Sequence, residues 1–281
     1  MSTKGGFTLT YGMFIQRREL NTESDGLLPD GGSQLVMAFV LVFGRVIFLG
    51  RTASKVEKVF KSDISLKRSI AALLLPSAFL DRTNWRCKWC HTIKQANCPR
   101  FQNREEMYGY LQHTLLKDAP IDYIEFGVAD GGSLRSWCAI NQHPESRFFG
   151  FDSFTGLPED WHPERPKGTF NRDGIPPEIA DPRVRFHVGL FQDSLPDFLD
   201  SYRPSNRVVI HNDSDLYSST LYTLIMMERI ISRDTVVIFD EFWDALHEYR
   251  ALSDYSAACR RAFRIIAATP RFTQVAVTLS R

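Results

Sequence analysis

The sequence has few cysteines and no recognisable export signal. Only 5 of its 281 residues are Cys, too few for the disulfide framework of a small secreted domain. No basic stub followed by an apolar core opens the chain, so we expect a cytoplasmic protein. Repeats and low-complexity tracts are also missing, while 43% apolar residues, including 21 Phe, are ample for a folded core.

Net charge is nearly absent, because the formal charge is only +1. This balance predicts no polyanionic partner, and we expect no binding of nucleic acid. The charge is nevertheless uneven: residues 1–100 carry 15 Lys/Arg and 7 Asp/Glu, whereas the other residues carry 19 and 26. The asymmetry predicts a basic, partly flexible N-terminal extension, residues 1–100, and a separate domain, residues 101–281.

The longest apolar run, residues 35–49, is short and is broken by Gly44 and Arg45. A spanning helix needs about 20 apolar residues, and a central Arg costs roughly 2.5–3.5 kcal/mol. We therefore expect a buried helix or a pair of strands here. A weak membrane-surface contact of residues 34–68 stays open, because several Lys and Arg follow the run directly.

From Phe101 onward, apolar strands alternate with helices, and Asn103 is placed to cap the first helix. The expected strands are 123–126, 147–151, 183–188, 207–210, 235–239, 264–268 and 272–279, with helices at 133–140, 191–202, 216–231 and 245–263. Such alternation predicts an α/β fold, a doubly wound and mostly parallel seven-stranded sheet. The last two strands flank Thr269-Pro270 and predict an antiparallel edge hairpin. Ligands of such sheets bind beyond the carboxyl ends of the strands.

The first polar motif is the glycine-rich stretch EFGVADGGS, residues 125–133. Its glycines allow a tight turn and close approach of a ligand, and the following helix N-terminus adds positive potential. The motif lacks the ending of a phosphate loop and the spacing of a dinucleotide fingerprint. Asp152 ends the next strand, where a carboxylate can accept both hydroxyls of a ribose. The pair predicts an adenosine-type ligand, although glycine turns and terminal Asp residues also occur as purely structural features.

The second polar feature is a group of acids that follows two strands. Asp213-Ser214-Asp215 follows the fourth expected strand, and Asp240-Glu241 follows the fifth. Neighbouring parallel strands would bring these carboxylates to one edge, where they would repel and raise each other's pKa. A divalent cation removes the conflict, and oxygen ligands favour Mg²⁺ over zinc. Capping and salt bridges are the alternative explanation.

These motifs together resemble the macrocin O-methyltransferase family, which includes the novobiocin-pathway sugar methyltransferases. The matching stretches are residues 125–133, 151–158 (FDSFTGLP), 189–196 (GLFQDSLP), 213–220 (DSDLYSST) and 239–241 (FDE). The resemblance covers roughly residues 101 to 281. It implies the class I methyltransferase fold, with S-adenosylmethionine as the methyl donor.

The resemblance also implies roles for single residues. It implies that the cofactor is held by Glu125, Gly127, Ser133, Asp152 and Ser153, with Gln192 and Asp193 near the adenine. It implies a Mg²⁺ held by Asp213, Asp240 and Glu241, with Asp215 as general base. Two departures bear on the metal: the family usually has a second Asp where Glu241 stands, and position 211 is His.

The sequence therefore predicts an O-methyltransferase acting on a hydroxyl of a sugar, a glycosylated natural product or a polysaccharide. We expect a small-molecule or glycan acceptor and a homo-oligomeric protein. The insert 153–182, with Trp161, His162 and Phe170, is expected to cover the acceptor or to be an ordinary surface loop. One alternative is a Mg²⁺-dependent hydrolase that uses the same carboxylates, which would not need the glycine turn and Asp152. Another is a non-catalytic protein that binds an adenosine ligand.

The N-terminal extension holds a smaller cluster, Cys87, Cys90, His91 and Cys98. The ligand count suits Zn²⁺, but the spacing is not that of a standard finger. We favour a basic linker that packs on the acidic domain. His187, His247 and Cys138 are expected to be structural.

Overall fold

The computed structural model describes residues 38–42, 45–49 and 77–280. The chain divides into two compact units, residues 1–67 and 68–281. In the first unit the described residues form an antiparallel strand pair, β1 (Ala38–Val42) and β2 (Arg45–Leu49). Of the two structures expected for the apolar run, the strand pair is therefore present. Most of residues 34–68, the stretch considered for membrane contact, lies outside the described residues. No described helix is long and apolar enough to cross a membrane.

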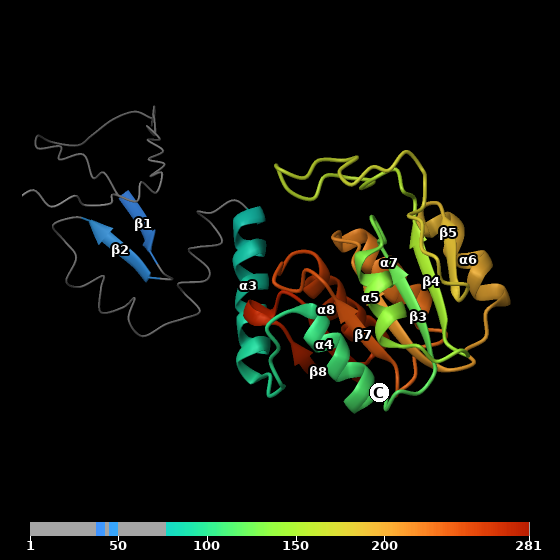
Figure 1. Ribbon diagram of the computed structural model, residues 1–281. Helices are drawn as coiled ribbons and strands as arrows, with labels where there is room; N and C mark the ends of the chain where they lie inside the picture. The colour runs from blue at the N-terminus through green and yellow to red at the C-terminus, as the bar shows by residue number, and fades with distance from the viewer. Residues whose placement is uncertain (1–37, 43–44, 50–76, 281) are drawn as a thin grey trace, which may run out of the picture. The chain divides into compact units, whose positions relative to one another are not determined.

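The second unit is built on a seven-stranded mixed sheet (Figure 1). Its strands are β3 (Ile121–Phe126), β4 (Arg147–Asp152), β5 (Val184–Val188), β6 (Arg207–Asn212), β7 (Val236–Phe239), β8 (Ala262–Ala268) and β9 (Val275–Ser280). The strand order is β5-β4-β3-β6-β7-β9-β8. The first five of these are parallel, and β9 runs antiparallel between β7 and β8. The predicted fold class is confirmed, including the antiparallel C-terminal strands.

Helices cover both faces of the sheet because its central strands are apolar on both sides. The helices that follow β3 in the chain are α5 (Gly132–Ile140), α6 (Phe191–Ser201), α7 (Tyr217–Met227) and α8 (Glu248–Cys259). A 3₁₀ turn, η2 (Pro270–Phe272), joins β8 to β9. Side chains alternate along a strand, so Ile124 packs in one core with Leu224 of α7, whereas Tyr123 packs in the other with Trp137 of α5.

The chain enters the sheet through α4 (Arg104–Tyr110) and a π-helical turn, η1 (Leu111–Leu115). As expected, Asn103 caps α4: its Oδ1 accepts a 2.8 Å hydrogen bond from the Glu106 N–H. Glu106 in turn accepts a 3.0 Å bond from the Gln102 N–H. These bonds satisfy donors that a helix start leaves unpaired.

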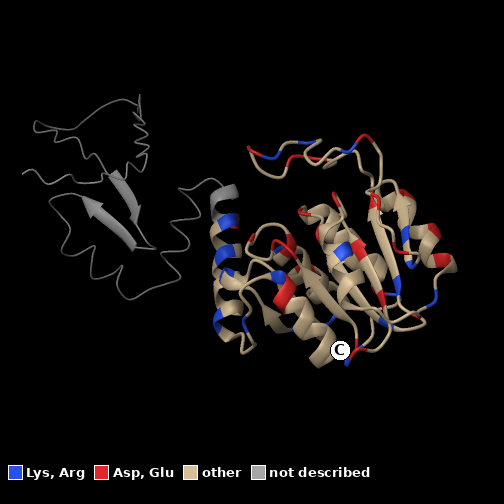
Figure 2. Cartoon of the chain, in the orientation of Figure 1, with Lys and Arg blue, Asp and Glu red and all other residues tan. Residues whose placement is uncertain are grey.

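A helix that the sequence pattern did not predict, α3 (Ser77–Gln95), precedes α4. Trp85 is buried in the core beside Tyr249 of α8, and the Trp89 indole donates a 2.8 Å hydrogen bond to the Phe242 carbonyl. Basic residues line the exposed side of the helix (Figure 2). Although α3 lies within the stretch assigned to the N-terminal extension, it packs as part of the domain that follows.

The packing of α3 predicts a large loss of stability for Trp85→Ala. Removing a buried Trp costs roughly 3–5 kcal/mol of unfolding free energy. Its neighbour Arg86 is exposed, so Arg86→Ala should change that free energy by less than about 0.5 kcal/mol. Urea unfolding of the two variants measures both values. Equal and small effects would mean that α3 is not part of the core.

Candidate active site

One cavity of about 500 Å³ opens at the carboxyl ends of the parallel strands. Each of the five parallel strands contributes a residue at or just beyond its end: Gly127, Asp152, Gly189, Asp213 and Asp240. The position agrees with the rule for ligand sites in such sheets. The cavity also includes the predicted residues Ser153, Gln192, Asp215 and Glu241.

The glycine turn brings β3 and β6 into very close approach. Gly127 has φ +86°, and a Cβ added there would lie 1.9 Å from the carbonyl oxygen of Asp213. The Gly127 N–H donates to the Phe151 carbonyl at 2.9 Å, and the Asp213 N–H donates to that of Phe126 at 2.9 Å. Only glycine fits this backbone, since it has neither a Cβ nor a preference for negative φ.

Asp152 binds the glycine turn directly. Its Oδ2 accepts hydrogen bonds from the N–H groups of Val128 (2.8 Å) and Ala129 (2.9 Å), and its Oδ1 accepts one from Phe154 (2.7 Å). The carboxylate therefore shapes the turn besides lining the cavity. These bonds are the structural role that the sequence analysis allowed for an Asp at a strand end.

The predicted acids converge, but in two overlapping groups. In the first group, one carboxylate oxygen each of Asp213, Asp215 and Glu241 lie within 4.8 Å of one another. In the second group, carboxylate oxygens of Asp213 and Asp240 and a ring nitrogen of His211 lie within the same distance of one another. We call these five residues the acid cluster. Desolvation, together with Asp240, raises the pKa of Asp213 well above its usual value and that of Glu241 to about 9. Such shifts are expected where buried carboxylates face one another.

Asp215 occupies an unusual backbone conformation in the cavity wall. Its φ is +61°, in the left-handed region that Asn and Asp tolerate better than most residues. Burial, reinforced by Asp240 and opposed by Arg165, raises its pKa to about 7. A carboxyl with a pKa near neutrality is suited to accept a proton.

Asp240 has two cationic or polar neighbours that the sequence did not assign. The Arg104 guanidinium, at the start of α4, lies 3.7 Å from Asp240 Oδ1, and His211 Nε2 lies 3.8 Å away. Burial disfavours ionisation of Asp240, but His211 and Arg104 outweigh it and hold the pKa of this carboxyl below its usual value. Arg104 lines the cavity. Its only sequence signal was its place next to the capping residue Asn103.

Three predicted cofactor residues do not line the cavity. Glu125 is buried in β3, where it accepts a 2.8 Å hydrogen bond from the Tyr123 hydroxyl. Burial raises its pKa to about 8. Ser133 is buried in the first turn of α5. Asp193 lines a separate, shallower pocket beside β5. Glu125 and Ser133 are the buried first and last residues of the glycine-rich stretch, whereas Asp193 lies in a different pocket.

The loop 153–183, between β4 and β5, forms the outer wall of the cavity. Its residues Trp161, His162 and Phe170 all line the cavity, opposite Trp243 from the loop after β7. Phe170 and Trp243 are 43% and 48% exposed, so both present open aromatic faces. The expectation that this insert covers a binding site agrees with its position.

The cysteine cluster does not form a metal site. All five cysteines lie among the described residues and are free, and the groups of converging ligand atoms do not include Cys87, Cys90, His91 or Cys98. Cys87 and Cys90 are exposed on α3, and His91 bonds to Gln95.

The acid cluster predicts that the ligand-free protein is less stable at alkaline pH. In the unfolded chain carboxyls ionise near pH 4, whereas folded Asp215 and Glu241 keep their protons up to about 7 and about 9. The folded state binds more protons in this window, so the free energy of unfolding falls as pH rises through it. Urea unfolding in EDTA at about pH 5.5 and about pH 8.5 should show the fall, with a smaller fall for Glu241→Gln. Stability that rises over this range would contradict the assigned shifts.

Comparison with known proteins gives the fold and domain type. Residues 124–242 match a family described as a methyltransferase domain. The structure of the O-methyltransferase NovP is similar, at 22% identity over 63% of this chain and 80% of that one, with a TM-score of 0.51. The calicheamicin methyltransferase CalS11 is 17% identical over 81% of this chain and 91% of its own, also with a TM-score of 0.51. No curated protein sequence matches the chain.

The matched residues run from β3 to the loop after β7, which is the part of the sheet that builds the cavity. The strand order of this chain is β5-β4-β3-β6-β7-β9-β8, and the fold as a whole resembles that of these solved structures. The second unit of this chain therefore has the Rossmann-like fold of class I methyltransferases, and residues 124–242 within it correspond to a methyltransferase domain.

Proposed function

We propose that the protein is an S-adenosylmethionine-dependent O-methyltransferase that acts on a hydroxyl of a sugar, a glycosylated natural product or a polysaccharide. One observation carries the proposal. A single cavity combines the glycine turn and Asp152 with the acid cluster and an Asp whose pKa is near neutrality. A methyl donor and an acceptor hydroxyl need to meet in such a space, since much of this catalysis is positioning.

The donor half of the cavity fits an adenosine-type ligand. S-adenosylmethionine would supply a methyl group on a positively charged sulfur. Gly127 lines the cavity at the end of β3, together with Asp152, Ser153 and Gln192. The neighbouring carboxylates favour a cation by charge. Glu125 and Ser133 are buried at the two ends of the glycine-rich stretch.

The acid cluster fits a hard divalent cation such as Mg²⁺. Oxygens of three carboxylates converge. Glu241 Oε2 is buried without a hydrogen-bond partner among the described residues, whereas Asp240 Oδ1 lies 3.7 Å from Arg104 and 3.8 Å from His211. Buried polar atoms of this kind call for a partner. Asp213 belongs to both converging groups and is the first residue we would assign to the ion, joined by Glu241 of one group and Asp240 of the other. When bound, the ion would stabilise negative charge on the acceptor oxygen.

Asp215 would act as the general base. Asp215 would accept the proton of the acceptor hydroxyl, and bound S-adenosylmethionine would supply the methyl group and leave as S-adenosylhomocysteine. The pKa of about 7 means that a large fraction of Asp215 is ionised at neutral pH. Arg165 on the loop 153–183 helps to keep the carboxyl ionised.

The acceptor half of the cavity, which we define as the part lined by Trp161, Phe170 and Trp243, is aromatic. Trp161, Phe170 and Trp243 offer flat apolar faces, and Glu164 and Arg165 add polar groups between them. A wall of aromatic side chains with a few polar groups is typical of a small-molecule site. It suits a sugar ring, which has apolar faces and a polar edge, and so supports the sugar acceptor that the family resemblance implies.

The proposal is tested by calorimetric titration of the full chain with S-adenosylmethionine and S-adenosylhomocysteine. We expect both nucleosides to bind, and methyl transfer to a glycoside panel to be lost with EDTA and restored by Mg²⁺. A protein that binds neither nucleoside but hydrolyses substrates with Mg²⁺ would be the alternative hydrolase. Binding of nucleosides with no transfer to any acceptor would favour the non-catalytic alternative. Transfer that is indifferent to EDTA would remove the metal from the mechanism.

A further inference from the structure

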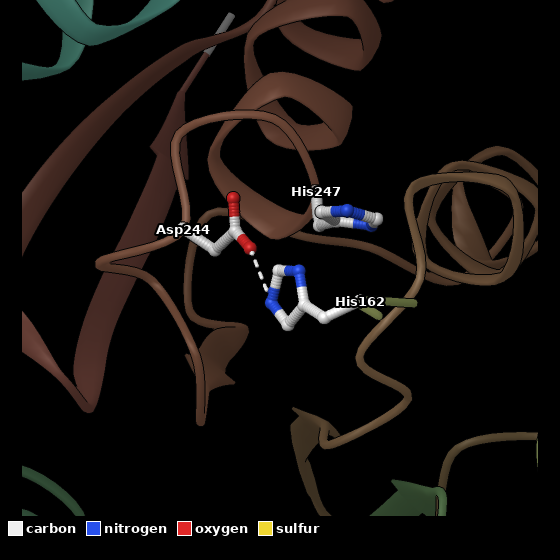
Figure 3. A group of neighbouring side chains, drawn as sticks. All are labelled: His162, Asp244 and His247. Carbon is white, nitrogen blue, oxygen red and sulfur yellow. Dashed lines mark ion pairs between the residues drawn. The ribbon is translucent and has the colours of Figure 1, made fainter. Parts of the chain in front are cut away.

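A second group of metal-ligand side chains lies beside the cavity, outside the acid cluster. One ligand atom from each of His162, Asp244 and His247 lies within 4.8 Å of the other two. His162 comes from the loop 153–183, whereas Asp244 and His247 come from the segment between β7 and α8. Figure 3 shows the three side chains as neighbours, with Asp244 and His162 facing each other and His247 beside His162. Of the three, only His162 lines the cavity.

Backbone hydrogen bonds hold the carboxylate of this group in place. Asp244 Oδ1 accepts a 3.0 Å bond from the Leu246 N–H, which leaves Oδ2 at 3.1 Å from His162 Nε2. The Asp244 N–H donates to the Glu241 carbonyl at 2.9 Å, and the His247 N–H donates to the Asp244 carbonyl at 3.3 Å. The Asp244 side chain is only 9% exposed. Two of the three ligands are therefore fixed by a single short turn.

The imidazoles are half-buried beside other aromatic rings. Trp161 stacks on His162 with ring centroids 4.7 Å apart, and the two His rings meet edge to face at 5.6 Å. His162 Nε2 is buried and makes no hydrogen bond of good geometry within the described part of the chain. Burial lowers the pKa of His247 although Asp244 opposes this. Neutral imidazole is the form that binds metals.

We propose that His162, Asp244 and His247 bind a divalent transition-metal ion of the zinc class. Two imidazole nitrogens and one carboxylate form a donor set that suits Zn²⁺ or Co²⁺ better than Mg²⁺, and they leave a fourth position for water. In the absence of metal, His247 Nδ1 accepts a 3.2 Å hydrogen bond from the Tyr217 N–H. Metal binding replaces this bond, because an imidazole with metal on one nitrogen carries its proton on the other.

The position of the site gives the ion a structural consequence. His162 belongs to the wall that covers the cavity, whereas Asp244 and His247 belong to the body of the domain. A bound ion would tie the loop 153–183 to the segment before α8. The 2.6 Å bond from the Ser218 hydroxyl to Glu159 is another polar tie between this loop and the body of the domain. The ion would therefore hold the cover of the acceptor half in place.

Cobalt absorption spectroscopy tests the proposal without any methyl-transfer assay. The tag-free full chain is stripped with EDTA, freed of chelator and titrated with Co²⁺. We expect intense visible bands of four- or five-coordinate Co²⁺, which Zn²⁺ abolishes and excess Mg²⁺ does not. A wild-type protein without such bands would overturn the proposal.

Variants locate the ion. His162→Gln and His247→Gln should each lose the bands, whereas His113→Gln should keep them, because His113 is exposed and pairs with Asp118. Asp213→Asn should also keep them, because it alters only the acid cluster. Bands that survive His162→Gln, or that vanish in Asp213→Asn, would place the ion elsewhere and contradict the proposal. Circular dichroism shows that each variant is folded. Titration with S-adenosylhomocysteine tests the proposed methyltransferase function independently, so a failure of the metal proposal can be told apart from a failure of that function.

Discussion

Asp215→Asn is expected to slow methyl transfer by about 10²–10⁴-fold, the usual contribution of a general base, while leaving the affinity for S-adenosylhomocysteine unchanged. The amide has the shape of the carboxylate but cannot take the acceptor proton. Asn also tolerates the left-handed conformation at this position, where φ is +61°. The variant should therefore fold normally, so that the slower methyl transfer measures the loss of the general base.

Single-turnover transfer and calorimetry measure the two quantities separately. Asp200→Asn is a matched control, because Asp200 is exposed on α6 and pairs only weakly with Arg229 at 3.4 Å. Its rate should equal that of the wild type. The wild-type rate should also fall below about pH 7, where Asp215 becomes protonated. A variant Asp215→Asn that turns over at a normal rate would assign the base to another residue.

Gly127→Ala is expected to lower the free energy of unfolding by roughly 3–5 kcal/mol, through backbone strain and overpacking together. The new Cβ would lie 1.9 Å from the Asp213 carbonyl oxygen, and the clash involves backbone on both sides. Either β3 or β6 must shift. The shift would separate the glycine turn from the acid cluster, so binding of S-adenosylhomocysteine should be lost as well.

Gly168→Ala separates the two causes. Gly168 has a similar φ, +84°, but a Cβ there meets nothing within 4 Å. Only backbone strain remains, which costs about 1 kcal/mol. Urea unfolding of both variants gives the comparison. If Gly127→Ala is no more destabilising than Gly168→Ala, the close approach of β3 and β6 is not a constraint on this fold.

The sheet could be predicted from the sequence because its strands carry strong local signals. The stretch 236–239 (VVIF) is apolar throughout and is followed by Asp240, and the stretch 148–151 (FFGF) is followed by Asp152. Parallel strands align their ends, so the residues after each strand necessarily meet at one edge. The cavity residues Gly127, Asp152 and Asp213 follow from that rule alone.

The helix α3 and the position of Arg104 depend on contacts between residues that are far apart in the sequence, so the local sequence pattern indicates them only weakly. The helix α3 is held by Trp85 and Trp89 against α8 and the loop after β7, contacts that no local pattern reveals. Arg104 reaches Asp240 because α4 packs in the core with Tyr123 and brings its first residue to the end of β7. Asp193 was predicted near the adenine but lies in a different pocket. The expected homo-oligomer and cytoplasmic location stay predictions.

In the proposed reaction, one cavity binds both the methyl donor and the acceptor. A crystal structure of the full chain with S-adenosylhomocysteine tests this most directly. We predict that the nucleoside contacts the turn at Gly127 and that its sulfur points toward Asp215 and Asp213. A nucleoside bound away from this turn, or with its sulfur on the side of the sheet opposite the acid cluster, would contradict the account.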